Sequence, residues 1–378
     1  MENTSPPPLN AAPPVTPPPV IVPPPPTRPP RKGRGWMVFA LILLVLLGFS
    51  VLLNFGALVE KTFSFKGGGF QARTAGPRLE EVVLEDNGAS SKIAVVEING
   101  IITGQLEQGG ANMVDIIKAQ LKRADDDSKV KAVILKVDSP GGEVLTSDEI
   151  YRAISDFQKQ SPKPVICSMG SLAASGGYYV SAPCRWIVAN ELTITGSIGV
   201  IMSTWNYRHL MDKVGVSPLV FKSGKFKDML SGTKDPSEIT DEEKQMVQVL
   251  IDETFGRFKS VVAEGREAAF QKNGQHGRQL ASDWADYADG RVLSGTEAFK
   301  LGFVDELGNF DVAVERTKQI AGITRKANLI EYRPRVDLAD LLGLFGKSDA
   351  KAIKLDLGMD LPKIEAGHLY FLSPTYLH

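Results

Sequence analysis

Short apolar runs and longer amphipathic stretches alternate along the middle of the chain. The apolar runs are rich in β-branched residues, as buried strands are, and they cover residues 92–98, 133–137, 164–168 and 186–189. Between the first two runs, apolar residues recur at helical spacing from Met113 to Ala124. This order of strand, helix and strand predicts an α/β fold with crossover connections.

Two helix starts follow from capping boxes, in which a Thr is followed three residues later by a Glu. Thr146 with Glu149 predicts one helix, and Thr240 with Glu243 predicts a second, longer one. Apolar positions continue along the longer helix as far as Val262. The periodicity leaves open whether they face the core or a neighbouring subunit.

The first 91 residues have a different pattern. Of the 24 prolines, 14 lie in the first 30 residues, so residues 1–35 are predicted to be a disordered, Pro-rich tail. Residues 36–59 contain no charge and extend over roughly 36 Å as a helix, enough for one transmembrane helix. Cations before this segment place the tail in the cytoplasm and the rest of the chain outside it. A cleaved signal peptide is the alternative. Residues 60–91 are predicted to be a linker.

Composition excludes some classes of function. The net charge of -1 gives no basic excess for nucleic acid. The two cysteines, Cys167 and Cys184, are interpreted as small buried hydrophobes, although a disulfide remains open. The four histidines are scattered and form no zinc pattern, so neither a metal nor a cofactor is predicted.

Ser175 is the first candidate for chemistry. It follows a predicted strand and precedes two glycines and a helix-like stretch, where free backbone N–H groups could stabilise an oxyanion. Gly142, after another strand, could bring a further N–H close because it lacks a Cβ. A simple connecting turn is the competing interpretation.

A serine nucleophile needs a base. His209 is one candidate, but no acidic partner is evident. A lysine base must be almost buried, because a free lysine with a pKa of about 10.4 is protonated at neutral pH. Lys222, Lys225 and Lys227 all lie among apolar neighbours, and chemistry alone does not choose among them.

Over residues 92 to 320 the chain resembles the bacterial signal peptide peptidases of the SppA type, peptidase family S49. The matching segments occur in the family's order and spacing: residues 138–142 (DSPGG), 169–179 (MGSLAASGGYY), 192–202 (LTITGSIGVIM), 222–228 (KSGKFKD), 289–295 (DGRVLSG) and 302–308 (GFVDELG).

The resemblance implies a role for five residues. The family's nucleophile falls on Ser175, and its general-base lysine falls on Lys227. The hydroxyl that hydrogen-bonds this lysine falls on Ser197. The oxyanion donors correspond to the backbone N–H groups of Gly142 and Gly176.

The resemblance also implies a ClpP/crotonase-like fold and a homo-oligomeric ring in which the lysine reaches the serine of an adjacent subunit. Residues 92–325 would form the protease domain, outside the inner membrane of a bacterium. Its substrates would be remnant signal peptides or other membrane-derived peptides. An acyl-CoA enzyme on the same fold and a catalytically inert membrane scaffold are the alternatives. The resemblance ends near Lys326, and the extension 326–378 could be disordered, an oligomer contact or a substrate mimic.

Overall fold

The computed structural model describes residues 39–47, 76–106, 111–335 and 369–372. The chain divides into two compact units, residues 1–73 and 74–378. In the first unit, residues 39–47 are helical and exposed, and the rest of the predicted transmembrane segment 36–59 lies outside the described residues, as does the tail 1–35. Within the described residues, no helix combines the length and the apolarity that a membrane crossing requires.

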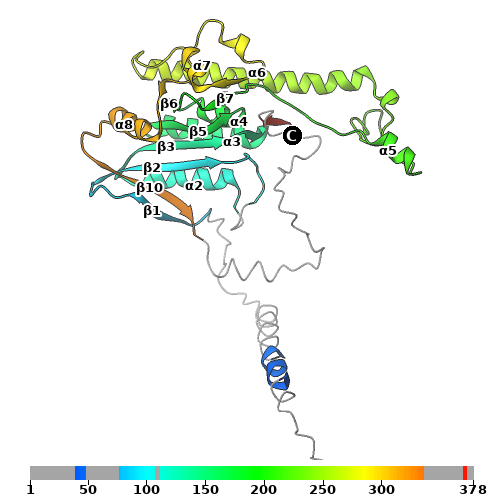
Figure 1. Cartoon of the computed structure of the whole chain (residues 1–378), viewed down its shortest axis with the longest axis horizontal. Coiled ribbons are helices and arrows are strands. Elements are labelled where there is room, and N and C mark those ends of the chain that lie inside the picture. The colour runs from blue at the N-terminus through cyan, green and yellow to red at the C-terminus, as the bar shows by residue number, and fades with distance from the viewer. Residues whose placement is uncertain (1–38, 48–75, 107–110, 336–368, 373–378) are drawn as a thin grey trace, which may run out of the picture. The chain divides into compact units, whose positions relative to one another are not determined.

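The second unit is built on a twisted, mostly parallel sheet (Figure 1). Its path runs β1-β10-β2-β3-β5-β6-β9, and only β1 is antiparallel to its neighbour on this path. The short strands β7 and β8 continue from the end of β5. The bounds are β1 (Leu79–Glu85), β2 (Ser91–Asn99), β3 (Val130–Ser139), β5 (Val165–Ala174), β6 (Trp186–Ala189), β7 (Ile194–Gly196), β8 (Val292–Ser294), β9 (Glu306–Leu307) and β10 (Ala327–Pro334).

Helices cover both faces of this sheet, which is why its strands are apolar on both sides. Alternate residues of β3 face opposite ways: Val133 and Leu135 pack in the larger core, and Ile134 packs on the other face beside α8. The helices are α2 (Met113–Asp126), α3 (Val144–Gln160), α4 (Gly176–Ser181), α5 (Arg208–Lys213), α6 (Asp241–Lys272), α7 (Gly295–Lys300) and α8 (Phe310–Ile320). The α/β fold with crossover connections is confirmed.

The main sheet extends beyond the predicted protease domain 92–325 at both ends, and one helix start needs correction. β1 lies in the predicted linker 60–91, and β10 lies in the predicted extension 326–378, yet β10 sits in the main sheet between β1 and β2. α3 begins at Val144, so Thr146 is not its cap. The carboxylate of Glu143, the last residue of β4 (Gly141–Glu143), accepts the Thr146 hydroxyl at 2.7 Å instead.

The predicted capping box at Thr240 and Glu243 is confirmed at the start of α6. The two ends of this 32-residue helix differ in burial. Phe258, Val261 and Val262 are fully buried in the core, whereas Val249 and Leu250 are exposed. The first half of α6 therefore extends beyond the sheet together with residues 201–240 and α5 (Figure 1). We call residues 201–250 the arm.

The buried end of α6 is fixed by an ion pair. Arg266 and Asp305 have side chains that are 0% and 1% exposed, and Nη2 of Arg266 donates to Oδ2 of Asp305. Asp305 also accepts the backbone N–H of Ile187 in β6 at 2.8 Å. Removing one member of a pair this buried would leave an uncompensated charge and cost about 3–5 kcal/mol. The pair thus joins α6 to the sheet.

Candidate active site

Ser175 lies between the end of β5 and the start of α4 and has an unusual backbone. Its φ is +54° and its ψ is -116°, a region that a residue with a Cβ seldom adopts. Its N–H donates to the carbonyl of Gly196 at 2.8 Å, and its carbonyl accepts from Tyr179 at 2.8 Å. Ser175 is 1% exposed, and its Oγ has no hydrogen-bond partner among the described residues. The turn holds a buried hydroxyl that the fold itself does not use.

A bulge in β5 places this turn. Val137 of β3 pairs with Met169 of β5, and Ser139 of β3 pairs with Ala173 of β5. Two residues of β3 therefore span the same distance as four residues of β5. The Asp138 carboxylate fills the bulge by accepting the N–H of Leu172 at 3.0 Å. This hydrogen bond gives Asp138, the first residue of the 138–142 segment, a structural role. It stabilises the bulged part of β5 that leads to Ser175.

Two glycines bring backbone N–H groups together beside Ser175. A Cβ on Gly176 would lie 3.1 Å from the backbone nitrogen of Gly142 and 2.8 Å from Oγ of Ser147. A Cβ on Gly142 would lie 1.9 Å from the carbonyl oxygen of Ile102. Neither position tolerates a side chain without displacement: Gly176 permits the close approach of α4 to β4, and Gly142 permits that of β4 to Ile102.

Ser197 lies beside Ser175 because β7 pairs with the end of β5. It also has a positive φ, +49°, and is 3% exposed. Its N–H donates to the carbonyl of Arg291 at 2.7 Å. Hydrogen bonds from Arg291 hold Asp289 in turn and lower the pKa of its carboxyl to about 2. The 289–295 segment therefore helps to fix the backbone of Ser197 through the Arg291 carbonyl.

Lys227 is not buried in the single chain. It is exposed on the arm, and its side chain makes no hydrogen bond or ion pair with any described residue. The two neighbouring candidates are paired, Lys222 with Asp228 at 2.7 Å and Lys225 with Glu242 at 2.5 Å. His209, the rival base, lies on α5 with 73% of its side chain exposed. The structure thus brings together Ser175, Ser197, Gly142 and Gly176, and it does not bring Lys227 to them within one chain.

A short strand near the C-terminus covers the two glycines. β11 (Tyr370–Leu372) is antiparallel to β4, with Phe371 opposite Gly142. A Cβ on Gly141 would lie 2.0 Å from the carbonyl oxygen of Phe371 and 2.6 Å from the backbone nitrogen of Gly176. The Phe371 carbonyl and the Gly176 amide therefore flank the same small space. The sequence identified the apolar end of the chain but not its position.

The other edge of β11 is paired as well. Tyr370 and Ile201 exchange two backbone hydrogen bonds of 3.0 and 3.1 Å. On the β4 edge, the pairing continues beyond the strand, because Val144 N–H donates to the carbonyl of Leu369 at 3.3 Å. The Phe371 side chain is fully buried, 4.9 Å from the Tyr179 ring and 4.7 Å from the Phe258 ring. β11 is thus an extended segment that pairs through its backbone with β4 on one side and with Ile201 on the other, while its apolar side chain is buried.

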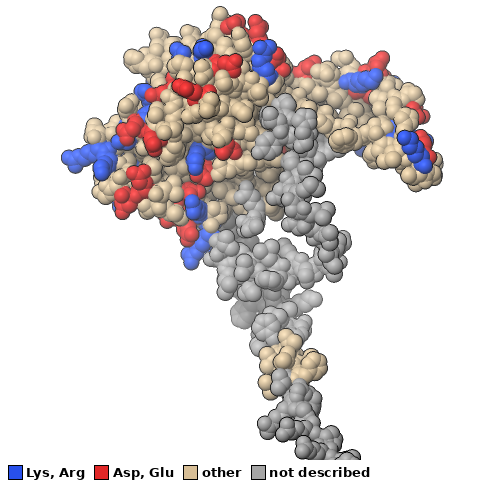
Figure 2. All heavy atoms as spheres, in the orientation of Figure 1, with Lys and Arg blue, Asp and Glu red and all other residues tan. Residues whose placement is uncertain are grey.

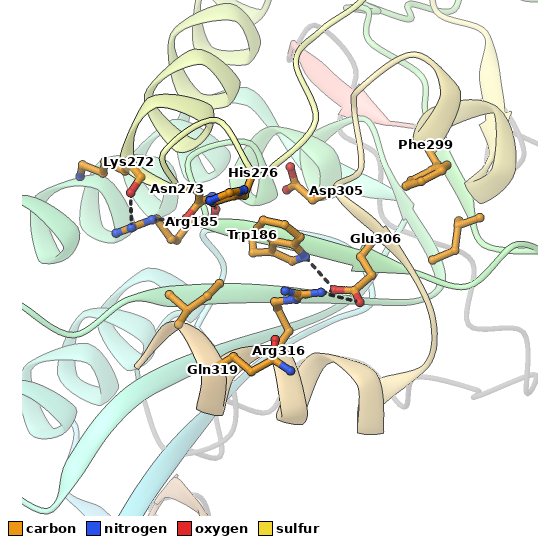
Figure 3. Close-up of a pocket in the computed structure, with 12 residues that line it drawn as sticks. Arg185, Trp186, Lys272, Asn273, His276, Phe299, Asp305, Glu306, Arg316 and Gln319 are labelled. Atoms are coloured by element: carbon orange, nitrogen blue, oxygen red, sulfur yellow. Dashed lines mark hydrogen bonds and ion pairs between the residues drawn. The ribbon is translucent and has the colours of Figure 1, made fainter. Parts of the chain in front are cut away.

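A separate cavity of about 750 Å³ lies at the β6–β9 edge of the sheet (Figure 3). Trp186 lines it, and the Glu306 carboxylate accepts hydrogen bonds from Trp186 Nε1 at 3.0 Å and from the Arg316 guanidinium at 2.7 and 2.9 Å. None of the predicted site residues lines it. Among the described residues no cluster of His, Cys, Asp or Glu could hold a metal ion. The two acids that line this cavity, Asp305 and Glu306, are ion-paired with Arg266 and Arg316.

Sequence similarity to known proteins assigns the chain to a family. The family described as Peptidase family S49 matches residues 157–324. A putative protease of Synechocystis is 38% identical over 232 residues, covering 61% of this chain and 75% of that protein. A putative signal peptide peptidase SppA of Enterococcus faecium is 35% identical, covering 68% of this chain and 71% of that protein.

The chain belongs to peptidase family S49. It is therefore a serine protease of the signal peptide peptidase type. Protease 4 of Haemophilus influenzae is 37% identical over 63% of this chain, which spans only 36% of that longer relative. The family match includes Ser175, Ser197 and Lys227 but begins after Gly142.

The position of β11 predicts that it limits access to Ser175. A chain ending at residue 368 should react with a fluorophosphonate probe about tenfold faster than the full chain, because reactivity scales with the fraction of open sites. The measurement is the labelling rate, with full-length Ser175→Ala as the control for labelling elsewhere. Equal rates in both chains would mean that β11 does not cover the serine in solution.

Proposed function

We propose that this chain is a membrane-anchored serine endopeptidase that uses Ser175 as nucleophile and Lys227 of an adjacent subunit as general base. The observation that supports the nucleophile best is the strained, buried Ser175, whose Oγ has no partner under a paired strand. The parallel order of the sheet and the helices on both faces support assigning the fold to the ClpP/crotonase-like class.

The proposed reaction has two halves. The neutral amine of Lys227 takes the proton from Ser175 Oγ, which attacks the peptide carbonyl carbon. The negative charge on the carbonyl oxygen is stabilised by the N–H groups of Gly142 and Gly176. The lysine then gives its proton to the leaving amine, and an acyl-serine remains. Water loses a proton to the lysine and attacks the acyl carbon. The ester bond to Ser175 then breaks, the lysine returns its proton to Ser175 Oγ, and a carboxylic acid is released.

Substrates are proposed to be extended, apolar peptides derived from the membrane, remnant signal peptides among them. β11 supports this class, because it is held through its backbone on both edges while Phe371 enters an aromatic pocket. Main-chain pairing accepts many sequences, and the pocket selects an apolar side chain. The family assignment disfavours both the acyl-CoA enzyme and the inert scaffold.

The arm supports a homo-oligomeric ring. Its large apolar side chains are strongly exposed in the single chain, including Trp205 at 80%, Leu219 at 82% and Phe221 at 87%. Figure 2 shows uncharged surface between the body of the unit and the charged end of the arm. Exposed apolar surface of this extent is typical of a protein contact. The general base needs desolvation, and a subunit that covers the arm would supply it to Lys227.

Replacement of Lys227 tests the base. Lys227→Arg keeps the positive charge but cannot accept a proton in the working range, so kcat/KM should fall by about a thousandfold or more. Ser197→Ala should lose about 1–3 kcal/mol of transition-state stabilisation through a lost hydrogen bond. Lys225→Ala, which breaks the exposed pair with Glu242 and the contact of the ammonium with the Phe226 ring, is the matched control and should stay active.

The pH dependence has a definite sign. Only the neutral amine accepts the serine proton, so kcat/KM should fall as the pH is lowered. The oligomer size of every variant must equal that of the wild type for the comparison to hold. An active Lys227→Arg enzyme would rule out the lysine base and favour His209 instead.

The membrane topology is tested in cells. Residues 1–35 are proposed to be cytoplasmic, residues 36–59 to cross the bacterial inner membrane, and the protease domain to lie outside the cytoplasm. Protease added to intact spheroplasts should then digest the domain while cytoplasmic markers survive. A domain protected until the membrane is lysed would reverse the orientation.

A further inference from the structure

The loop that carries Lys227 is held by ion pairs on its flanks. Asp228, the next residue, pairs with Lys222 at 2.7 Å and lies 3.8 Å from Nζ of Lys234. Leu230 has a φ of +59°, which a bulky residue adopts only when its surroundings impose it. The backbone around Lys227 is therefore fixed, although its own side chain is exposed.

Lys234 joins this loop to α6. Its Nζ donates to Oε1 of Glu243 at 2.6 Å, and the two side chains are 10% and 2% exposed. The other carboxylate oxygen of Glu243 accepts the N–H of Thr240 at 2.8 Å, so this residue both caps α6 and binds the loop. The hydrogen bond between the two groups lowers the pKa of Glu243 and raises that of Lys234. Both are charged at neutral pH.

Helix α6 connects this pair to the body of the unit. Its second half is buried in the core, and a Cβ on Gly265 would lie 2.6 Å from the carbonyl oxygen of Ala182, just after α4. The body that holds Ser175 and the loop that holds Lys227 are therefore linked by one helix. At the loop end, the link is the contact between Glu243 and Lys234.

We propose that Glu243 is a positioning residue for the general base: through Lys234 it fixes the loop that presents Lys227 to the neighbouring Ser175. This inference rests on the proposed function. A general base must lie within hydrogen-bond reach of its proton, and a displacement of about 1 Å can cost 100-fold in rate. An exposed lysine on an unanchored loop would sample many positions. On an anchored loop, the Cα of the lysine is held in one place, so its amine samples fewer positions.

The chain permits a clean test of the pair. Glu243→Gln keeps an oxygen for the Thr240 N–H, because Gln serves in a capping box as well as Glu, but it removes the charge that Lys234 binds. Lys234→Met removes the same pair from the other side, together with the ion pair between Lys234 and Asp228, and Lys234→Arg retains the charge for both. The matched control is Asp241→Asn, which breaks an exposed pair with Lys244 in the same helical turn.

We expect Glu243→Gln and Lys234→Met each to lower kcat by about 10- to 100-fold with KM nearly unchanged. Lys234→Arg should recover most of the loss, and Asp241→Asn should match the wild type. The double variant should be no worse than Lys234→Met alone, because Lys234→Met already removes the ion pair that Glu243→Gln breaks. The measurements are steady-state kinetics on a peptide substrate and oligomer size for the full-length protein.

Two results would overturn the inference. One is a kcat within about twofold of wild type in Glu243→Gln, since such a base would need no anchor. The other is a loss of activity that only follows a loss of assembled enzyme, which would make the pair structural. Lys227→Ala separates this from the proposed function. If Lys227→Ala is active, the dyad is wrong; if it is inactive and Glu243→Gln is normal, only the positioning role fails.

Discussion

The turn at Ser175 depends on strand pairing on both sides of β5. The left-handed backbone of this serine persists because its N–H is bonded to Gly196, the last residue of β7, and because β3 holds the bulge before it through Asp138. Strain of this kind typically costs about 1–3 kcal/mol and survives only where the surrounding structure determines it. The same pairing brings Ser197 to the site, and the glycines of β4 and α4 then fit against the turn. The serine, its neighbouring hydroxyl and the amide pair form one rigid unit.

The proposed base lies on a different kind of structure. Lys227 lies on an arm whose apolar side chains are exposed and whose connection to the core is the long helix α6. If Ser175 is the nucleophile and Lys227 the base, as proposed, assembly controls activity, because the serine and the lysine are not in contact within one chain. Under this account the exposure of Lys227 in one chain is expected. The ion pairs around its loop and the buried pair Arg266–Asp305 at the other end of α6 then define the geometry between the two.

The sequence predicted what depends on local pattern. The strands at residues 133–137 and 186–189 and the capping box at Thr240 are present because apolar runs and caps act within a few residues. β1, β10 and β11 could not be predicted in this way, because each pairs with a segment far away in the chain. The Thr146 cap was wrong because Glu143 binds the Thr146 hydroxyl once β4 forms. Glu243 was predicted only as a cap, since its partner Lys234 precedes the helix.

The most direct test of a dyad shared between subunits mixes two inactive chains. Ser175→Ala and Lys227→Ala enzymes should each be inactive alone. In demonstrably mixed oligomers, some interfaces join an intact serine to an intact lysine, so partial proteolytic activity should return. Mixed oligomers that remain inactive would place both residues within one chain and contradict a dyad shared between subunits.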